Sequence, residues 1–511
     1  MLSRINSCGL MGIDGFQVFV ETDISNGMPI FEVVGLPDTA VREAKERVRA
    51  AIKNTGFVFP AKRIITNLAP ASQKKGGSSY DLPITISILT ATEQLPVEDN
   101  DTTMFIGELS LDGTISSVSG ILPMVITAYK HGFKRVFVPK DNANEAAVID
   151  GIEIYPAASL HEISDHFTGI KRIKPHHVDL DDFFKEQSSS LLDFCDVKGQ
   201  ENVKRALEIA AAGNHNVLLI GSPGTGKTML AQRMPGILPD LTFDEALEVT
   251  KIHSIAGMLP KNIPLIINRP FRSPHHTISA AGLSGGGSTP KPGELSLAHN
   301  GILFLDELPE FHRDALEVLR QPLEDGEVTI SRVNATLTYP CNIMLIASMN
   351  PCKCGYLGDT RRECTCTPAS INRYRSKISG PLLDRIDIQV EVASVDYDDL
   401  SSVNKGEKSA SIKERVNKTR KIQLKRYKDL NIYSNSQLTA GMLQEFCPLG
   451  EEENAILKAA FDNLGLSARA HSRILKVART IADLEDSERI NTNHIAEAIQ
   501  YRSLDRKYFE G

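Results

Sequence analysis

No stretch of this 511-residue sequence is apolar for long enough to cross a membrane as a helix, which takes about 20 residues. The longest apolar runs, such as VLLI at 217–220 and GILFL at 301–305, have the length of buried strands. The first residues, MLSRINSCGLMGIDG, also lack the sustained apolar segment of a signal peptide. We therefore expect a cytoplasmic protein that makes no contact with membranes.

Cysteine is scarce as well, and positive charges are outnumbered, with 57 Lys and Arg residues against 64 Asp and Glu residues. Of the eight cysteines, four are scattered and four form one cluster, which does not resemble the disulfide framework of a secreted protein. The formal net charge of −7 argues against general attraction to nucleic acid, so any contact with DNA or RNA must come from local basic patches. Repeats of the solenoid type are absent from the sequence.

What is present is a globular composition, with 41% hydrophobic and 24% charged residues, over a length that predicts about two to four domains. Residues 1–180 have the pattern of strands and helices separated by turns, and residues 181–192 are polar, as is typical of a linker. Residues 193–395 predict an α/β core, and residues 396–511 have a strongly helical pattern.

Two local patterns make sharper predictions about the first of these parts. QVFVETDI (17–24) and PIFEVVG (29–35) flank the turn sequence SNGM and predict a β-hairpin. Residues 38–56 predict a helix, with Asp38 as its N-cap and Gly56 as its stop. Apolar residues recur in this helix at helical spacing and form its predicted buried face: Val41, Ala44, Val48 and Ile52.

The segment NVLLIGSPGTGKTMLAQRM (216–234) predicts an apolar strand, a glycine loop and the start of a helix. Its loop fits the pattern G-x-x-x-x-G-K-[ST], whose backbone N–H groups wrap phosphate oxygens. Lys227 would reach the β- and γ-phosphates, and the Thr228 hydroxyl would bind Mg²⁺. The alternative is a glycine-rich turn without a ligand. The candidate nucleotide-binding residues are Gly221, Ser222, Pro223, Gly224, Thr225, Gly226, Lys227 and Thr228.

A second apolar run, GILFLDELPE (301–310), ends in two acids. An acid at the carboxyl end of a parallel strand lies where α/β sheets bind ligands. Asp306 would hold Mg²⁺, and Glu307 would orient and activate the attacking water. The run is a weak signal alone, but together with the glycine loop it predicts that the chain binds and hydrolyses a nucleoside triphosphate.

Two further side chains complete this prediction, each with an alternative. Asn350 ends the apolar run NIMLIASMN and would orient water near the γ-phosphate, or it forms a turn before Pro351. Arg385, in SGPLLDRIDI, would contribute a positive charge to catalysis, or it forms a local ion pair with Asp384 or Asp387.

The cysteine cluster follows Asn350 directly, in two C-x-C pairs formed by Cys352 with Cys354 and Cys364 with Cys366. Four thiolates suffice for a tetrahedral, structural Zn²⁺ site, although C-x-C is tighter than the usual spacing. The alternatives are a reduced loop without metal and a pair that forms a disulfide on oxidation. A catalytic role is not expected, since nucleotide hydrolysis needs no thiol.

In this order the motifs resemble those of the AAA+ ATPases. The strings RPFRSPHHTISAAGLSGGG, KPGELSLAHNGILFLDELPEF and SGPLLDRIDI are similar to the magnesium-chelatase-like YifB/ComM family over nearly the whole chain. The resemblance implies ATP and Mg²⁺ as cofactors, and it makes Arg385 an arginine finger that enters a neighbouring subunit, hence a homo-oligomeric ring, most simply a hexamer. It also implies a helical lid at 396–511 with Arg469 as the sensor-2 residue, or Arg473 as the second candidate.

The N-terminal part has a resemblance of its own. Residues 104–142, MFIGELSLDGTISSVSGILPMVITAYKHGFKRVFVPKDN, are similar to the Lon-protease-like domain, which implies an α+β fold for 1–180. Lon uses a Ser–Lys dyad. Ser79 falls near the serine position, but the lysine position is Leu122. Because a serine without its base is a weak nucleophile, we expect a scaffold that is not proteolytic.

The resemblance further implies a motor that acts on branched or single-stranded DNA, with branch migration during natural transformation as its reaction. Three segments offer DNA contacts: 279–293 with Lys291, 327–340 with Arg332, and the basic run from Lys405 to Lys428. The alternative is that these are ordinary surface loops and a solvated helix. Two other functions remain open, a protein-remodelling ATPase like the magnesium-chelatase motor subunit and a regulatory nucleotide-binding protein with little turnover.

Overall fold

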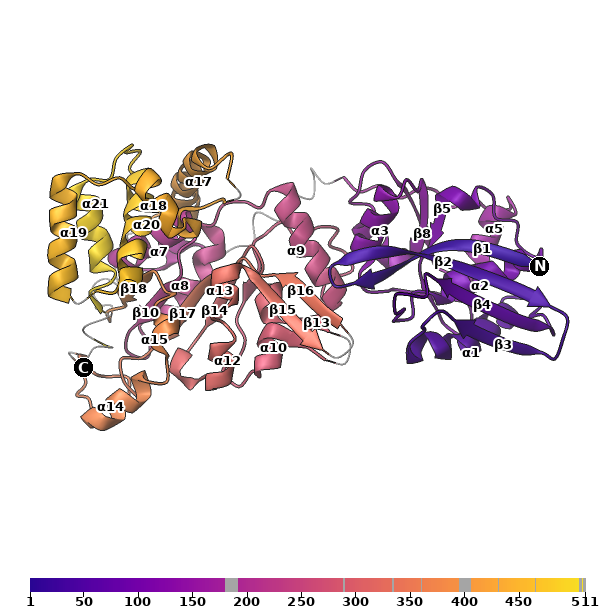
Figure 1. Cartoon of the computed structure of the whole chain (residues 1–511), viewed down its shortest axis with the longest axis horizontal. Coiled ribbons are helices and arrows are strands. Elements are labelled where there is room, and N and C mark those ends of the chain that lie inside the picture. The colour runs from indigo at the N-terminus through magenta and orange to yellow at the C-terminus, as the bar shows by residue number, and fades with distance from the viewer. Residues whose placement is uncertain are drawn as a thin grey trace. The chain divides into compact units, whose positions relative to one another are not determined.

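The chain divides into two compact units in this computed structural model (Figure 1). The first unit comprises Met1–Glu186 and Phe243–Ile266, and the second comprises Gln187–Thr242 and Ile267–Gly511. Of the predicted linker at 181–192, only the last residue lies within the described part of the chain. The described residues are 1–179, 192–287, 290–332, 335–359, 361–394, 406–430, 432–464, 466–504 and 508.

The first unit is built on a seven-stranded mixed sheet of order β3-β4-β2-β1-β5-β8-β9. The β1–β2 and β2–β4 pairs are antiparallel, and the other neighbouring pairs are parallel. Apolar residues of the sheet and its helices form the core of this unit. The strands are β1 (Leu2–Met11), β2 (Asp14–Ser25), β3 (Ile30–Val34), β4 (Arg63–Ala69), β5 (Thr103–Phe105), β8 (Arg135–Pro139) and β9 (Glu153–Ala157), with a small β6–β7 ribbon at Glu108–Leu109 and Ile115–Ser116.

The predicted hairpin of 17–24 with 29–35 is wrong. Strand β4 lies between β2 and β3, antiparallel to β2 and parallel to β3. The reason is helix α1 (Thr39–Asn54), which carries the chain from β3 back to the start of β4, as a parallel pair requires. The helix prediction itself is confirmed, because Asp38 accepts a hydrogen bond from the Val41 N–H at 2.9 Å. All four residues predicted for the buried face are fully buried: Val41, Ala44, Val48 and Ile52.

Helix α9 (Phe243–Ala256) lies inside the predicted 193–395 core by sequence but folds with the first unit. Its Ser254 carbonyl accepts a hydrogen bond from the Gly120 N–H at 3.1 Å, and its Ser254 hydroxyl bonds the carboxylate of Glu145. Glu145 is buried and also accepts from the Leu122 N–H at 2.9 Å. The other helices of this unit are α2 (Asp81–Ala91), α3 (Ile121–Lys130), α4 (Ala143–Ala146) and α5 (Leu160–Phe167).

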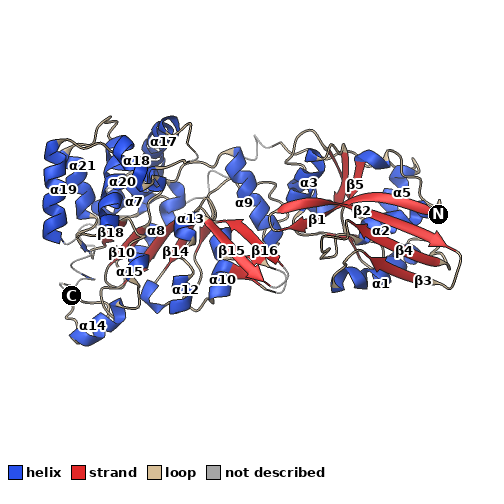
Figure 2. Ribbon diagram, viewed as in Figure 1, coloured by secondary structure: helices blue, strands red, loops and turns tan. Residues whose placement is uncertain are grey.

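The second unit contains a five-stranded parallel sheet of order β11-β14-β17-β10-β18. Strands β10 and β14 are buried along their whole length, as expected of a parallel sheet covered on both faces, and the parallel-sheet core predicted from the sequence is confirmed. Figure 2 distinguishes its strands from the surrounding helices by colour. The strands are β10 (Val217–Ile220), β11 (Phe271–Arg272), β14 (Ile302–Leu305), β17 (Met344–Met349) and β18 (Ile388–Glu391).

Helices precede and connect these strands. The helices are α7 (Glu201–Gly213), α8 (Lys227–Arg233), α10 (Ala280–Ser284), α11 (Glu294–Leu297), α12 (Arg313–Glu317), α13 (Pro322–Asp325), α14 (Pro368–Arg375) and α15 (Gly380–Leu383). Two antiparallel ribbons stand outside the main sheet, namely β12 (Gly285–Gly286) with β13 (Lys291–Pro292) and β15 (Glu327–Arg332) with β16 (Ala335–Pro340).

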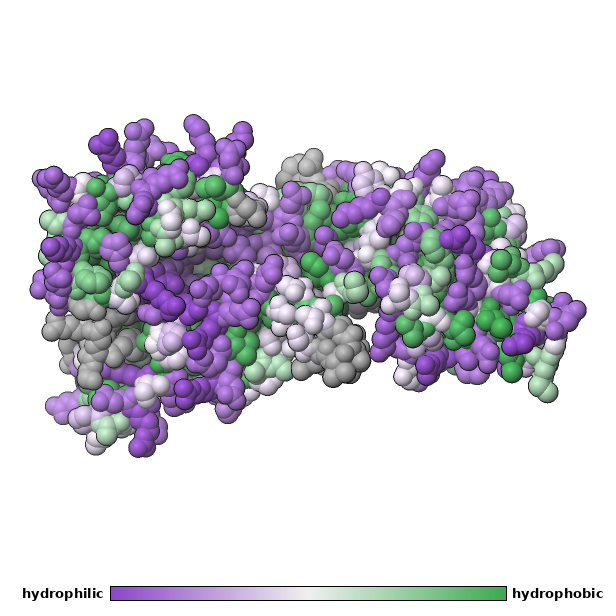
Figure 3. All heavy atoms as spheres, in the orientation of Figure 1, coloured by the Kyte–Doolittle hydropathy of each residue, from purple (hydrophilic) through white to green (hydrophobic). Residues whose placement is uncertain are grey.

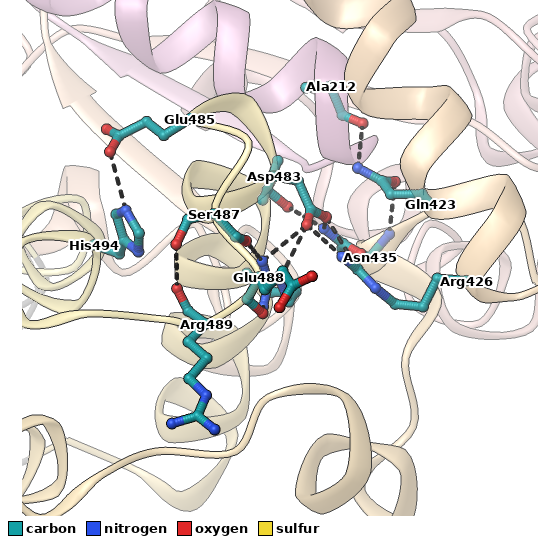
Figure 4. Close-up of polar contacts among 12 residues, drawn as sticks. Ala212, Gln423, Arg426, Asn435, Asp483, Glu485, Ser487, Glu488, Arg489 and His494 are labelled. Carbon is teal, nitrogen blue, oxygen red and sulfur yellow. Dashed lines mark hydrogen bonds and ion pairs between the residues drawn. The ribbon is translucent and has the colours of Figure 1, made fainter.

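The C-terminal helices share one hydrophobic core with α7 and the parallel sheet. A buried carboxylate, Asp483, ties them together (Figure 4). It accepts hydrogen bonds from Arg426 at 2.8 Å, from Asn435 at 2.9 Å and from Arg479 at 3.1 Å. Gln423 extends the network by donating to the Ala212 carbonyl at 3.0 Å. The helices are α17 (Ser409–Arg426), α18 (Ala440–Phe446), α19 (Glu451–Leu464), α20 (Ala468–Leu484) and α21 (Thr492–Gln500).

The surface carries both polar and apolar side chains. On the face drawn in Figure 3, hydrophobic residues are scattered among hydrophilic ones, which is ordinary for a folded protein. Among the described residues, no helix combines the length and the apolar character needed to span a membrane.

Candidate nucleotide site

A glycine-rich loop joins strand β10 to helix α8, at the carboxyl edge of the parallel sheet. Gly224 and Gly226 have φ angles of 81° and 90°, a left-handed conformation that favours glycine. At Gly221 a Cβ atom would lie 2.4 Å from the carbonyl oxygen of Val392, which directly follows strand β18. These positions need glycine, so the pattern read from the sequence has a local structural cause.

Lys227 begins α8, and its buried amine folds back over this loop. Its Nζ donates to the carbonyl oxygens of Gly221 at 2.7 Å and Ser222 at 3.0 Å, and to Asn350 Oδ1 at 3.2 Å. Burial lowers the pKa of Lys227, while the carboxylates of Asp306 and Glu307 act to raise it. The amine is therefore positioned where a phosphate oxygen could replace a carbonyl as its partner.

Asp306 follows β14 and is held by three donors. The Thr228 hydroxyl donates to Asp306 Oδ2 at 2.8 Å, while the Ser348 hydroxyl and the Glu307 N–H, at 3.1 Å, both bond Oδ1. Two ligand oxygens at right angles on Mg²⁺ lie about 2.9 Å apart, given Mg–O bonds of about 2.05 Å. The hydroxyl and carboxylate oxygens of Thr228 and Asp306 therefore fit a Mg²⁺ ion in both chemistry and spacing.

Glu307 has a left-handed backbone, with φ of 54°, which is uncommon for a residue with a side chain. Its N–H also lies 3.3 Å from Ser348 Oγ, so the residue is fixed between the ends of β14 and β17. Asn350 follows β17, the neighbouring strand. The structure thus brings the glycine loop, Asp306, Glu307 and Asn350 to one edge of the sheet.

Arg385 lies elsewhere in the same unit, and its side chain is only 12% exposed. Its guanidinium pairs with Glu324 and donates to the Pro381 carbonyl at 2.7 Å. The acidic neighbours considered from the sequence have other partners, because Asp384 faces Arg469 at 3.5 Å and Asp387 pairs with Arg473. Among the contacts of the described residues, none joins Arg385 to the glycine loop of its own chain.

Asp387 is a buried carboxylate that the sequence did not single out. It pairs with Arg473 and lies 3.3 Å from His215 Nδ1. Burial acts to raise the pKa of Asp387, but the charge of Arg473 and the bond to His215 outweigh it, so the pKa lies well below its ordinary value. The pair fixes Arg473, whereas Arg469 is 60% exposed at the start of α20.

Ser348 and Asn216 are two more residues that the sequence did not single out. Ser348 fixes Asp306, and Asn216 donates to the Arg385 carbonyl at 2.8 Å while accepting from the Leu345 N–H at 2.8 Å. A polar side chain inside the apolar run LIASM was the available signal for Ser348. Asn216 had none, because its partners are more than a hundred residues away.

The four clustered cysteines are not joined by disulfide bonds, and their sulfur atoms all lie within 4.8 Å of one another. The cluster occupies the segment between β17 and α14, in the same unit as the glycine loop. The structure therefore assembles the two C-x-C pairs into a single group, as a shared metal ion would require.

The two candidate DNA-contact segments at 279–293 and 327–340 pack together. Tyr339 Oη donates to the Pro290 carbonyl at 3.0 Å, and a Cβ atom on Gly285 would lie 2.8 Å from Ile330 Cδ1. Lys291 is exposed. Residues 288–289, the hairpin tip at 333–334 and the side chain of Arg332 lie outside the described residues.

The third candidate segment, the basic run from Lys405 to Lys428, begins outside the described residues and continues as α17. Several of its cations face acids of the same unit. Lys413 lies 2.5 Å from Asp240, Lys418 lies 2.9 Å from Asp486, and Arg415 pairs with Glu208 at 2.5 Å. These pairs make a solvated, structural helix face the simpler account of the run.

The positions matched to the Lon dyad are both buried. Ser79 precedes α2, and Leu122 lies in the first turn of α3, where its N–H is bonded to Glu145. Leucine provides no base at this position, so the expectation of a non-proteolytic domain stays as it was.

A five-stranded parallel sheet with a glycine loop, an acid pair and an asparagine at its carboxyl edge defines a mixed α/β P-loop protein. Comparison with protein families gives the particular class. Residues 20–142 match the family "Subunit ChlI of Mg-chelatase", 193–400 match "Magnesium chelatase, subunit ChlI", and 406–502 match its C-terminal family.

Relatives of known sequence agree with these matches. Competence protein ComM of Haemophilus influenzae is 42% identical over 507 residues, which cover 99% of this chain and 98% of the relative. The uncharacterized protein YifB of Escherichia coli is 44% identical over 514 residues, with 99% and 98% coverage. The magnesium-chelatase 38 kDa subunit of Rhodobacter capsulatus is 26% identical over 217 residues, 39% of this chain and 56% of that protein.

The chain therefore belongs to the YifB/ComM family of magnesium-chelatase-like proteins. Membership supports an AAA+-type ATPase that uses ATP and Mg²⁺.

Proposed function

We propose that the chain forms a ring, most simply a hexamer, that couples ATP hydrolysis to movement on DNA, with branch migration of recombination intermediates as its reaction. The observation that carries the hydrolysis step is the convergence of two hydrogen-bonded pairs, Lys227 with Asn350 and Thr228 with Asp306, at one edge of the sheet. The DNA step is supported by similarity over 99% of the chain to a protein named for competence.

In this proposal each residue of the site has one task. Lys227 binds the β- and γ-phosphates, and Thr228 with Asp306 holds Mg²⁺, which, when bound, neutralises charge on the phosphate oxygens. Glu307 orients and activates the attacking water, and Asn350 positions that water from the neighbouring strand. Ser348 keeps the Asp306 carboxylate in place.

The ring is proposed because the family resemblance makes Arg385 an arginine finger that acts on a neighbouring subunit, while in its own chain Arg385 bonds Glu324 and the Pro381 carbonyl. As an arginine finger it would exchange Glu324 for the γ-phosphate in the neighbouring subunit. We assign Arg469 as the sensor-2 residue of a helical lid at 396–511, since Arg473 is engaged by the buried Asp387. The N-terminal 1–180 would be a Lon-like scaffold, joined to the 193–395 ATPase core through 181–192.

The segments 279–293 and 327–340 are the proposed DNA contacts in the pore of the ring. Their packing through Tyr339 and Ile330 supports movement of the two segments as one body. Glycines in the first segment let a nucleic-acid strand approach the backbone closely, and Lys291 supplies a charge for phosphate.

A protein-remodelling ATPase is the second candidate, because all three family matches are to a magnesium-chelatase subunit. In that case the N-terminal unit would bind a protein partner. The two candidates share the nucleotide site and differ in whether DNA stimulates turnover.

The deciding experiment compares wild type, Lys227→Ala and Glu307→Gln for ATP hydrolysis and for migration of labelled four-way DNA junctions. We expect wild type to migrate junctions, Lys227→Ala to lose ATP binding, and Glu307→Gln to bind ATP without turnover. DNA affinity should fall steeply with salt. Junctions left unmoved by wild-type ring and ATP would overturn branch migration, and turnover unchanged by every DNA would favour protein remodelling.

A further inference from the structure

The four clustered sulfur atoms have the spacing of ligands around a single metal ion. Cys352 Sγ lies 3.3 Å from Cys354 Sγ and 3.6 Å from Cys364 Sγ, and Cys354 Sγ lies 3.6 Å from Cys364 Sγ. Four thiolates bound to Zn²⁺ at about 2.3 Å in a tetrahedron lie about 3.8 Å apart. A disulfide needs about 2.05 Å, so these distances fit a mononuclear metal site and not a disulfide pair.

Backbone donors surround the sulfur atoms, as they do where thiolates carry negative charge. The Cys354 N–H donates to Cys366 Sγ at 3.4 Å, and the N–H groups of Tyr356 and Thr365 donate to Cys354 Sγ. Four thiolates on one Zn²⁺ leave a net charge of about −2, which such donors stabilise from outside the ligand sphere. A loop of neutral thiols would have no comparable need for them.

The segment that carries these residues, which we call the cysteine loop (352–359 and 361–366), has no helix or strand among its described residues. Cys352 is buried, but the other three cysteines are only half-buried, so apolar burial does not explain why four sulfur atoms gather there. A metal ion would hold the four sulfur atoms together, as zinc does in other irregular loops that fold around it.

The cysteine loop lies against the glycine loop of the nucleotide site. Gly355, directly after Cys354, approaches Pro223 so closely that a Cβ atom there would be 2.5 Å from Pro223 Cδ. The Asp359 carboxylate accepts a hydrogen bond from the Ser222 side chain. The loop also begins two residues after Asn350, which contacts Lys227.

We propose that Cys352, Cys354, Cys364 and Cys366 bind one structural Zn²⁺ that holds the cysteine loop against Ser222 and Pro223 and thereby sets the affinity for ATP. With four protein ligands the ion has no open position, so it braces the site and does not act on the substrate. The metal assignment depends only on the thiols. Its effect on nucleotide binding rests on the proposed ATPase function.

The first test is the metal content of the full chain purified without chelators, measured by elemental analysis. Wild type should carry about one zinc per chain, and Cys352→Ser with Cys364→Ser should carry almost none. A control that removes two thiols outside the cluster, Cys195→Ser with Cys447→Ala, should keep the metal. Zinc well below one per chain in wild type, iron in its place, or equal zinc in the cluster variant would overturn the assignment.

The second test measures the affinity for a fluorescent ATP analogue, which needs no turnover and therefore reads out even if hydrolysis fails. The cluster variant should bind the analogue about tenfold more weakly or worse, because a small displacement of the phosphate loop is costly. Cys366→His is the control for misfolding. It alters the same loop but should still bind zinc, because histidine can replace one thiolate as a zinc ligand. It should keep both metal and affinity. Unchanged affinity in a zinc-free, folded variant would overturn the bracing role.

Discussion

Two glycines of the cysteine loop share a left-handed backbone but have different surroundings. Gly355 has φ of 88° and Gly358 has φ of 80°, so alanine would be strained by about 1 kcal/mol or more at either position. Only at Gly355 would the added carbon meet another residue, at 2.5 Å from Pro223 Cδ, while nothing lies within 4 Å at Gly358. The two positions therefore separate backbone strain from contact with the nucleotide site.

We predict that Gly355→Ala weakens ATP binding about tenfold, because the clash pushes Pro223 out of place, while Gly358→Ala changes ATP binding less than about twofold. The affinity for the ATP analogue and the KM of hydrolysis are the measurements. Equal effects of the two substitutions would mean that the contact between the loops does not reach the nucleotide.

At this scale the sequence identified residues within one motif better than their partners. The roles of Lys227 and Thr228 could be predicted because both residues belong to one continuous motif, the glycine loop. The partner of Arg385 could not be predicted in this way. The sequence offered Asp384 and Asp387, but the fold supplies Glu324, which is 61 residues away, and uses the two aspartates for arginines of α20.

Among the elements, α20 is anchored to the sheet by a buried charge. Asp387, just before β18, pairs with Arg473 of α20 and with His215, just before β10. Removing one partner of a buried, hydrogen-bonded charge cluster leaves the others uncompensated, which costs about 3–5 kcal/mol. This carboxylate is therefore one of the links between the C-terminal helices and the parallel sheet, beside their shared hydrophobic core.

We predict that Asp387→Asn lowers the melting temperature at pH 7 and flattens its pH dependence. The folded pKa of Asp387 lies below its unfolded value of about 3.9, so its contribution is complete above that value and is lost as the pH falls below it. Wild type should therefore lose more stability than the variant between about pH 5 and pH 3. Calorimetry or circular dichroism over this range provides the measurement.

The matched control is Asp384→Asn, which removes a neighbouring carboxylate whose arginine partner, at 3.5 Å, is 60% exposed. Such a pair contributes about 0–1 kcal/mol, so the melting temperature should change little. Melting curves of wild type and Asp387→Asn that stay parallel from pH 5 to pH 3 would show that Asp387 does not carry the acid sensitivity.

Elements were predicted well where local pattern decides them and poorly where pairing is distant. The apolar runs at 217–220 and 302–305 became β10 and β14, and the spacing of residues 38–56 gave α1. The hairpin at 17–35 failed because β4, almost thirty residues further on, inserts between its two strands. Strand order depends on the packing of the whole sheet, which turn residues alone do not encode.

At the scale of the whole molecule, helix α9 belongs to one unit by sequence and to the other by fold, and this has a consequence for truncated forms of the chain. The helix comes from the middle of the second unit by sequence, yet it folds with the N-terminal residues, and its Val249 and Ile252 are buried. Its anchor, Glu145, is also buried, and burial raises the pKa of that carboxyl. The N-terminal unit is thus completed by a piece of the ATPase sequence.

We predict that a fragment beginning at residue 192 exposes the apolar face of α9, binds hydrophobic dyes and sediments as aggregates, because α9 folds with the N-terminal unit, which the fragment lacks. The same fragment with Val249→Lys and Ile252→Lys should bind less dye and aggregate less. Dye fluorescence and sedimentation provide the measurements. If the fragment without these substitutions neither binds dye nor aggregates, α9 does not need the N-terminal unit.

The proposed ring leads to the last prediction, because it assigns two residues of one chain to two different sites. In the proposed ring, Lys227 would serve its own subunit and Arg385 would serve the neighbour. Lys227→Ala and Arg385→Ala should each abolish hydrolysis alone, the second by about 10³-fold or more while ATP still binds. In a random one-to-one ring, about a quarter of the interfaces join an intact Lys227 site to an intact Arg385, so mixing should restore part of the activity.

Mixing Lys227→Ala with Glu307→Gln is the control, since both defects lie in the same site and no neighbour can supply what is missing. That mixture should stay inactive. If Lys227→Ala with Arg385→Ala also stays inactive in proven mixed rings, Arg385 does not act across the interface, and its pair with Glu324 is structural. Restored hydrolysis would instead mean that Arg385 leaves Glu324 during turnover, which Glu324→Gln should make easier and not abolish.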